Sequence, residues 1–308
     1  MKPAPAAYRA GKIGEGAQTM ARTALDAVSA HLIDTREEAN SGFWFQAHGD
    51  VVRREEGGSF TNFGFTQNVD LGYRQDGFGG QIGFDKSFGG ARLGLTGGYE
   101  SSVMNFRGAG DRVTLDAWSG GLYAAFAAGP LFVNAQGLYT RYSVEARLRS
   151  AGAEDRFNGH SWSGKLQAGL RLGGSGFFAE PVVGLSYVDT SLGALSALGA
   201  RIDFTDSEGL FGEAGLRLGS AMNLAGGARL TLYASGSAVK SFEGTNRARF
   251  VTGATAIELG SDRLPTHGLG KLGVSIGQGR FTGFLEGRAV VADDYRGGGA
   301  RMGLRIAF

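Results

Sequence analysis

Residues Arg301–Phe308, RMGLRIAF, end the chain on a strict alternation of side-chain character. In an extended strand, successive side chains point to opposite faces of the sheet. One face is then apolar and the other is polar or small: Met302, Leu304, Ile306 and Phe308 against Arg301, Gly303, Arg305 and Ala307. An unpaired apolar strand edge invites aggregation. The stretch therefore predicts a terminal strand whose edge is paired and whose apolar face is covered.

The composition restricts the class of protein. The chain has 308 residues, 55 glycines, no cysteine, a hydrophobic content of 42% and a net charge of +2. It has no run of eighteen apolar residues, which excludes a membrane-spanning helix. Acidic and basic residues are interspersed, so no basic field for nucleic acid is expected. The first residues, MKPAPAAYRAGKIGEG, lack the apolar core of a signal peptide. We expect a fragment of an exported protein, with its export signal upstream.

Residues 14–40 are typical of a helix, because they are rich in alanine and contain no proline. Apolar residues recur along one narrow stripe of this helix: Ala21, Leu25, Val28 and Leu32. About 25 residues at ~1.5 Å each reach roughly 37 Å, enough to cross an outer membrane. The pattern fits either an amphipathic helix that caps a soluble core or a slim rod inside a wet channel.

After Ser41 the apolar periodicity changes to two, which is typical of strands. The expected strands are 42–54, 78–88, 91–106, 112–127, 131–147, 157–172, 177–189, 206–218, 228–242, 265–277, 280–293 and 299–308. In the fourth of these the alternation breaks near Trp118, which predicts a bulge there or a shifted register.

The connections between these strands alternate in length. Tight turns such as SFGGAR and GQGR separate longer polar segments such as NFRGAGDR and ADDYRGGGA. Bacterial outer-membrane barrels sort their connections in this way, with short turns in the periplasm and long loops outside. The sequence therefore predicts an all-β fold: a twelve-stranded antiparallel transmembrane β-barrel with an N-terminal helix through its lumen. Residues 1–40 would be linker and lumen helix, and residues 41–308 the barrel.

Closing the barrel explains the terminal strand, because a closed sheet has no edge. We expect Phe308 to end a strand that pairs with the first one, near GFWFQAHGD. Aromatic residues near the strand ends suit the girdles of such barrels: Trp44, Tyr73, Tyr99, Tyr187 and Tyr295. Alternation alone predicts a set of lumen charges that hold the helix: Arg141, Glu145, Glu213, Arg217, Glu286 and Arg288. A diffusion channel is the alternative, with the helix outside the barrel or at one mouth.

Several motifs resemble one family, the autotransporter β-domain, which is the C-terminal translocator of type V secretion. GGQIGFDKSFGGARLGLTGGYES resembles its early hairpin, with Gly83, Asp85, Leu93 and Gly94 at the matching places. SGKLQAGLRLGGSGFFAEPVVGLSYV resembles its central hairpin, and YASGSAVKSFEG its ninth strand. The ending fits the assembly signal of outer-membrane proteins through Arg301, Gly303, Ile306 and Phe308. Porins share this ending, but the helix followed by twelve strands is more specific.

The resemblance implies passage and anchoring rather than chemistry. Such a domain would sit as a monomer in the lipid of the bacterial outer membrane, assembled with the help of the barrel assembly machinery. Its helix would lead to an N-terminal passenger, which is not in this chain. Some relatives cleave the helix at an Asn-Asn pair. Here only Asn40 stands before Ser41, so this form of self-release is not expected.

Enzymatic chemistry has weak candidates. His160 lies beside Ser161 and Ser163, and outer-membrane phospholipases use serine and histidine, so a hydrolase is a further alternative. His48 with Asp50, and the pair Asp293 and Asp294, are explained more simply as polar lumen residues. The histidines do not cluster at ligand spacing, so no catalytic residue, metal site or cofactor is expected.

Overall fold

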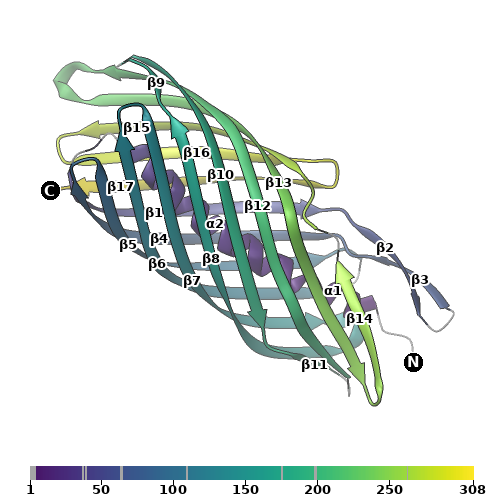
Figure 1. Ribbon diagram of the computed structural model, residues 1–308. Coiled ribbons are helices and arrows are strands. Elements are labelled where there is room, and N and C mark those ends of the chain that lie inside the picture. The colour runs from purple at the N-terminus through teal and green to yellow at the C-terminus, as the bar shows by residue number, and fades with distance from the viewer. Residues whose placement is uncertain are drawn as a thin grey trace.

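A computed structural model describes residues 5–36, 38, 40–62, 65–108, 110–174, 176–197, 200–261 and 263–308. Two helices come first, α1 (Pro5–Ala10) and α2 (Ile13–Thr35) (Figure 1). The strands that form the barrel wall are β1 (Gly42–Arg54), β4 (Tyr73–Phe88), β5 (Ala91–Phe106), β6 (Arg112–Ala128), β7 (Leu131–Leu148), β8 (Ala153–Leu170), β10 (Phe177–Leu192), β12 (Ala200–Asn223), β13 (Arg229–Thr252), β15 (His267–Gln278), β16 (Phe281–Val291) and β17 (Tyr295–Ala307).

Each wall strand pairs antiparallel with the next wall strand along the chain, and β17 returns to pair with β1. The register of this seam sets Phe43 opposite Ile306 and Gly42 opposite Ala307. Among the described residues the wall therefore has twelve strands and no open edge. Closure satisfies every ladder hydrogen bond internally, which a sheet in lipid requires. The expected fold class is confirmed.

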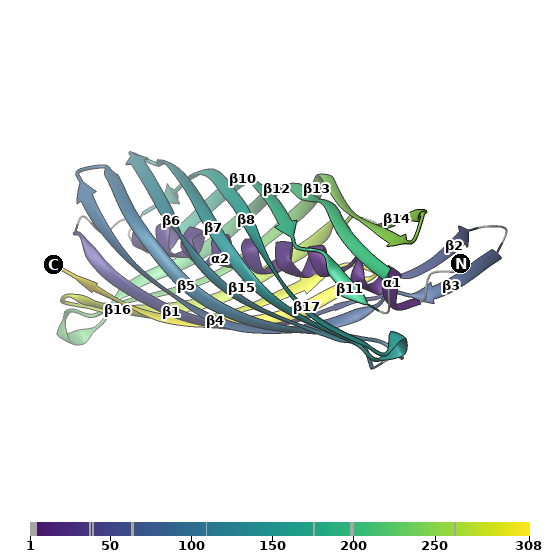
Figure 2. The same cartoon turned by 90° about the horizontal axis from the view of Figure 1, so that it is seen from below.

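Five short strands lie outside this wall. β2 (Gly57–Asn62) and β3 (Phe65–Asp70) form a separate hairpin that projects beyond the barrel (Figure 1). β14 (Thr255–Ser261) and β11 (Leu195–Ala197) pair with the ends of β13 and β12, and β9 (Leu172–Gly173) pairs with β10. Except for β9, they belong to the connections at the end of the barrel where α1 lies (Figure 2).

The strands match the expected ranges closely at the end of the barrel with tight turns and run longer at the other end. β12 and β13 have 24 residues each, well beyond the expected 206–218 and 228–242. Residues 295–298, expected in a loop, pair with β1 instead. Polar segments can continue the antiparallel ladder into water, because the ladder satisfies their backbone groups on both sides. These extensions carry the wall past the membrane.

The outer face of the barrel is an apolar belt. In the terminal stretch, Met302, Leu304, Ile306 and Phe308 are 61%, 44%, 40% and 55% exposed, whereas Arg305 on the other face is 3% exposed. On β6 the belt runs from Trp118 to Phe126, both of which face outward. Transmembrane barrels carry such a lipid-facing apolar band on their outer face. Lipid is therefore the cover that the terminal strand requires.

The aromatic girdle differs from the expected one. Trp44, Tyr73 and Tyr295 point into the lumen and are 5%, 1% and 4% exposed. Tyr99 and Tyr187 face outward as expected, and the other outward aromatic side chains along the upper rim of the belt are Trp118, Tyr139 and Trp162. Strand-end aromatics do not identify a girdle by themselves, because alternation sends half of them inward.

Next to β5, β6 and β7, the outer half of the lumen is filled by apolar side chains rather than by water. Side chains of β5, β6 and β7 pack there with α1 and the start of α2: Met104, Val113, Leu115, Tyr142, Val144, Ala7, Ala10, Ile13 and Ala17. On β6 the apolar side chains thus point inward up to Ala117 and outward from Trp118. The registers of β6 with β5 and β7 contain no shift, so the expected bulge is wrong. The alternation breaks because the apolar surroundings change from lumen to lipid.

Met104 shows how tightly this filling is packed. It is fully buried, and a Cβ at Gly16 would lie 2.3 Å from its Sδ atom. We expect Met104→Ala to cost about 2–5 kcal/mol, because truncation leaves a cavity against α2. Hydrogen exchange of the amides around Gly16 would measure the loss. Leu95→Ala is the matched control, since Leu95 lies on the same strand but is 57% exposed toward lipid. Equal exchange in the two variants would contradict packing of the helix on β5.

Candidate functional site

The candidate site is the lumen together with α2, which runs through it from the outer mouth to the periplasmic end (Figure 2). The predicted stripe of Ala21, Leu25, Val28 and Leu32 is 0–1% exposed. Its lower part packs on Trp44 and Tyr123, and its upper part on Leu138 and Val188. Burial is not confined to this stripe, because charged residues on other faces of α2 are enclosed as well. The helix ends at Thr35, earlier than the expected residue 40.

At the outer mouth, buried charges fix the start of α2. Lys12 donates to Glu15 at 3.1 Å and also to Glu56 in the connection after β1. Arg54 lies 3.2 Å from Glu15, and the hydroxyl of Tyr73 donates to the same carboxylate at 2.7 Å. Lys12, Glu15 and Arg54 are at most 1% exposed, so water cannot replace these partners. Losing one of them would leave a buried charge uncompensated.

A second anchor at the mouth lies outside the membrane band. Glu55 accepts hydrogen bonds from Arg107 at 2.8 Å and from Arg296 at 2.7 Å. These two guanidinium groups lower the pKa of Glu55 below its ordinary value. The contact joins two of the outer connections, after β1 and after β5, to the start of β17.

Half-way along the lumen, one lysine links the helix to the wall. Lys165 on β8 donates to Asp26 of α2 at 2.8 Å and to Glu213 of β12 at 3.0 Å. Wall amides also reach the helix backbone, with Gln136 bound to Leu25 O at 2.7 Å and Gln81 bound to Ala24 O at 3.3 Å. Carbonyls of the helix that already take part in its own ladder thus gain second partners from the wall.

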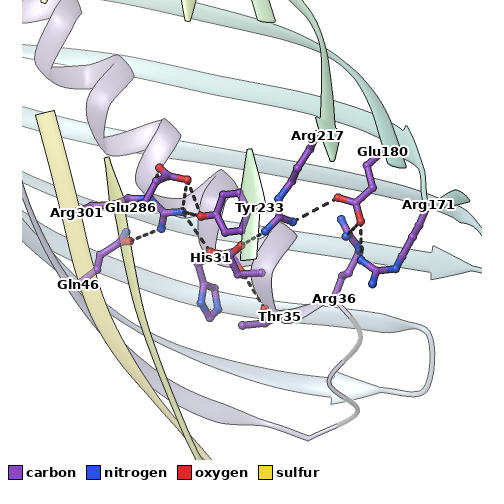
Figure 3. A network of polar contacts seen from close by, with 11 residues as sticks. His31, Thr35, Arg36, Gln46, Arg171, Glu180, Arg217, Tyr233, Glu286 and Arg301 are labelled. Carbon is purple, nitrogen blue, oxygen red and sulfur yellow. Dashed lines mark hydrogen bonds and ion pairs between the residues drawn. The ribbon is translucent and has the colours of Figure 1, made fainter. Parts of the chain in front are cut away.

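Nearer the periplasm, an arginine–carboxylate network surrounds the last turns of α2 (Figure 3). Glu180 is fully buried and accepts hydrogen bonds from Arg36, from Arg171 at 2.6 Å and from Arg217 at 3.3 Å. Arg217 also donates to Asp34 of the helix at 2.8 Å. One wall carboxylate therefore gathers three cations, one of which comes from the end of the helix.

The same network continues onto the terminal strand. Arg301 of β17 donates to Asp34 at 3.2 Å and to Glu286 of β16 at 2.7 Å. The hydroxyl of Tyr233 donates to Glu286 at 2.7 Å, as Figure 3 shows. Asp34 is thus held by arginines from two wall strands, β12 and β17. Such paired contacts fix both the depth and the rotation of α2.

A separate cluster, which we call the exit cluster, holds the helix at its exit. Asp85 of β4 is fully buried and lies 2.8 Å from His31 Nε2 and 3.3 Å from Arg305, with Arg92 at 3.6 Å. Tyr123 also donates to this carboxylate at 3.3 Å. One anion on the wall therefore joins the helix to both β5 and β17.

Beyond Asp85 the two arginines continue onto the segment that follows the helix. Arg92 donates to the Thr35 hydroxyl and to Glu38 O at 2.6 Å. Arg305 pairs with the Glu38 carboxylate and donates to Asn40 O at 2.7 Å. These bonds satisfy backbone carbonyls of the segment that follows the helix, which have no ladder partner of their own. They lead the chain from the lumen into β1.

Little open space remains in the lumen. A cavity of about 60 Å³ lies between α2 and the wall beneath β12–β17, and two others measure about 20 Å³ each. Such volumes hold at most a few waters, each of which takes ≈ 30 Å³ in the liquid. Lys271 lines the largest cavity and makes no hydrogen bond or ion pair within the part of the chain that the structure describes.

The predicted lumen charges divide into two groups. Glu213, Arg217, Glu286 and Arg288 point inward, although Arg288 pairs with Asp50 of β1 rather than with α2. Arg141 and Glu145 are wrong, because both lie on the outer face of β7. Glu145 pairs there with Arg147 and Arg156. The prediction extended a polar-inside rule to the upper part of the strand, where Tyr142, Val144 and Ala146 fill the lumen instead.

Other residues that hold the helix did not appear among the predictions. Asp34, Asp85, Arg92, Lys165 and Arg305 all bond across the helix–wall boundary. The alternation of the terminal stretch already set Arg305 opposite the apolar face. That signal was sufficient to place it in the lumen.

The predicted assembly-signal residues occupy both faces of β17. Arg301 belongs to the lumen network, whereas Ile306 and Phe308 face lipid. Gly303 lies beneath the Phe284 ring, where a Cβ would come within 2.5 Å of the ring. Their role in assembly stays a prediction.

The hydrolase candidates do not come together. His160 is exposed on the outer face of β8, whereas Ser161 and Ser163 point into the lumen. Ser161 instead shares hydrogen bonds with Thr190 at 2.6 Å and Tyr142 at 2.9 Å. Within the described ranges, no three histidine or carboxylate side chains gather as metal ligands, and neither helix is long and apolar enough to cross a membrane.

Comparisons with known proteins agree with this geometry. The autotransporter beta-domain family matches residues 57–287. The pertactin autotransporter of Bordetella bronchiseptica is 25% identical over 253 residues, which are 77% of this chain and 27% of that protein. The chain thus spans about a quarter of the length of this relative.

Solved structures share the fold. The translocator domain of the autotransporter NalP from Neisseria meningitidis superposes with a TM-score of 0.68 at 18% identity, covering 96% of this chain and 99% of that one. The beta domain of the Bordetella autotransporter BrkA gives a TM-score of 0.65 at 22% identity, covering 87% and 100%. With most of its length matched and a helix sealed inside a closed barrel, the chain belongs to the autotransporter beta-domain family and forms an outer-membrane translocator.

Proposed function

We propose that this barrel delivers an N-terminal passenger to the cell surface and afterwards keeps α2 in its lumen as plug and tether. The observation that carries the proposal is the direction of the helix. Its start lies among the long outer connections at Lys12, and its end lies at the periplasmic turns beside Asp85. A segment joined to the N-terminal end of α1 would therefore begin outside the cell.

The chemistry of the lumen supports passage followed by docking. The lower lumen is lined with polar and charged side chains, which an extended chain can pass without exposing backbone groups to lipid. Once α2 arrives, three separate clusters bind it: at Glu15, at Asp26 and around Asp34 and His31. We infer that the barrel assembly machinery inserts the domain and that the barrel has no catalytic role of its own.

A reporter fusion tests delivery. A small cysteine-free enzyme with an export signal is joined upstream of residue 1, and its activity and protease sensitivity are measured on intact Gram-negative cells. We expect surface activity that external protease removes. The control lacks residues 295–308, so that β17 cannot close the barrel. A reporter that stays in the periplasm while the barrel inserts normally would contradict the proposal.

A further inference from the structure

Arg141 occupies an unusual place on the outer face of β7. The outward residues of this strand are apolar or small from Leu131 up to Tyr139 in the girdle, and Arg141 is the next outward residue. It is therefore the first charged side chain above the apolar belt. In a membrane this is the level of the lipid headgroups, where long basic side chains extend from apolar surroundings toward phosphate.

The strand registers surround Arg141 with aromatic rings. Trp118 of β6 and His160 of β8 stand directly opposite it on its two sides. One step lower, Tyr139 stands opposite Trp162, with ring centroids 4.8 Å apart, and Tyr139 lies 5.9 Å from the His160 ring. Residues opposite each other on one face have Cβ atoms about 5 Å apart, so these side chains form one continuous surface. We call Trp118, Tyr139, Arg141, His160 and Trp162 the outer-girdle patch.

No group among the described residues neutralises Arg141. It is exposed and makes no hydrogen bond or ion pair with any residue that the structure describes. The nearby acids have other partners: Asp116 accepts from Tyr99 at 2.9 Å, and Glu145 is held by Arg147 and Arg156. Asp189 lies one strand further on, opposite Trp162. The patch therefore presents an unpaired guanidinium and an imidazole above a wall of aromatic rings.

We propose that the outer-girdle patch binds an anionic glycolipid of the outer leaflet, whose phosphate is held by Arg141 and His160. A guanidinium offers two parallel N–H donors to phosphate oxygens, which is the strongest arrangement for this pair. The acyl chains then lie along Trp118, Tyr139 and Trp162. The site adds a specific lipid ligand to the translocator role. It lies on the outer face of the barrel, away from the lumen.

The distribution of tryptophan gives a direct assay. The chain has three tryptophans, of which Trp118 and Trp162 are 69% and 62% exposed within the patch, while Trp44 is 5% exposed in the lumen. The full chain is placed in vesicles of phosphatidylcholine with brominated acyl chains, which quench outward tryptophans. Unbrominated bis-phosphorylated lipid A is then added in steps. We expect fluorescence to recover at a much lower mole fraction of lipid A than random mixing allows.

Two variants locate the effect. Arg141→Gln should weaken the apparent affinity for lipid A about tenfold, the size expected for one hydrogen bond between charged groups. Lys240→Gln is the matched control, because Lys240 also lies outward just above the belt, but on β13. Both changes are on the exposed face, and circular dichroism checks that the barrel is retained. Random mixing in the wild type, or equal loss in the two variants, overturns the proposal.

Further arms identify the source of the phosphate. Dephosphorylated lipid A should mix randomly in the wild type, and recovery as strong as with lipid A would overturn the role of phosphate. Inorganic phosphate alone should leave the quenching unchanged. Saturable recovery with inorganic phosphate would assign the patch to a free anion and overturn the lipid assignment. None of these outcomes depends on passenger delivery, so this proposal and the reporter fusion can fail separately.

Discussion

Deleting residues 1–40 should raise the single-channel conductance of the barrel in a planar bilayer on the order of tenfold, because a helix with its side chains fills a cylinder about 10–12 Å wide. With α2 in place, the cavity between the helix and β12–β17 is about 60 Å³, which admits little more than single waters and ions. Ions must then pass along one side of the helix beneath β12–β17. Without the helix, the whole polar lumen becomes available to electrolyte.

A second deletion serves as the control for this experiment. Removing residues 61–66 shortens the projecting hairpin of β2 and β3 but keeps Phe60, which stacks on Tyr8 of α1, so that α2 stays in the lumen. Its conductance should stay as low as that of the whole chain. Large and equal conductance for the whole chain and for the chain without residues 1–40 would mean an open pore, and would favour the diffusion channel instead.

Asp85→Asn should loosen the helix more than any other conservative change at the exit of the lumen. The substitution keeps the shape of the side chain but removes the carboxylate shared by His31, Arg92 and Arg305. Breaking a buried ion cluster by removing one partner costs about 3 kcal/mol or more, since the remaining charges lose their counter-ion without reaching water. Helix release should then become at least about 150-fold more frequent.

The absence of cysteine makes this release measurable. In an Ala30→Cys background, the only thiol is buried against the lumen cavity, so a maleimide reacts only when the helix moves out. The rate of labelling should rise by that factor in Asp85→Asn. Asp76→Asn is the matched control on the same strand, because Asp76 pairs with Arg74 on the exposed face. Such exposed pairs contribute about 0–1 kcal/mol. Equal rates in the two variants would show that Asp85 does not hold α2.

The exit cluster also connects the helix to the seam of the barrel. His31 stacks on Trp44 of β1 at a centroid distance of 4.4 Å, while Arg305 and Arg301 of β17 bond to Glu38 and Asp34. The first and last wall strands therefore share a partner in the lumen besides their own ladder. When the barrel closes around α2, the helix therefore contacts both β1 and β17, the two strands whose pairing closes the sheet.

Local sequence patterns were sufficient to predict the architecture of the barrel. A period of two, the alternation of short and long connections and the terminal RMGLRIAF determined twelve strands, a closed sheet and a lipid-facing side for Met302 and Phe308. The alanine-rich composition likewise determined a helix before the barrel, and its stripe from Ala21 to Leu32 is buried. These features follow from backbone geometry and from the sorting of apolar side chains, which act over a few residues at a time.

Whether a given face of a strand contacts lipid, water or other side chains depends on the tertiary structure. Above the girdle, β7 has an apolar part of the lumen on one side and water on the other, so Arg141 and Glu145 lie outside and Val144 inside, the reverse of the rule that holds lower on this strand. His31 lies 54 residues from Asp85 in the chain, and Arg217 lies 183 residues from Asp34. Ion pairing depends on charge and distance in space, and the closed barrel alone brings these residues within reach of one another.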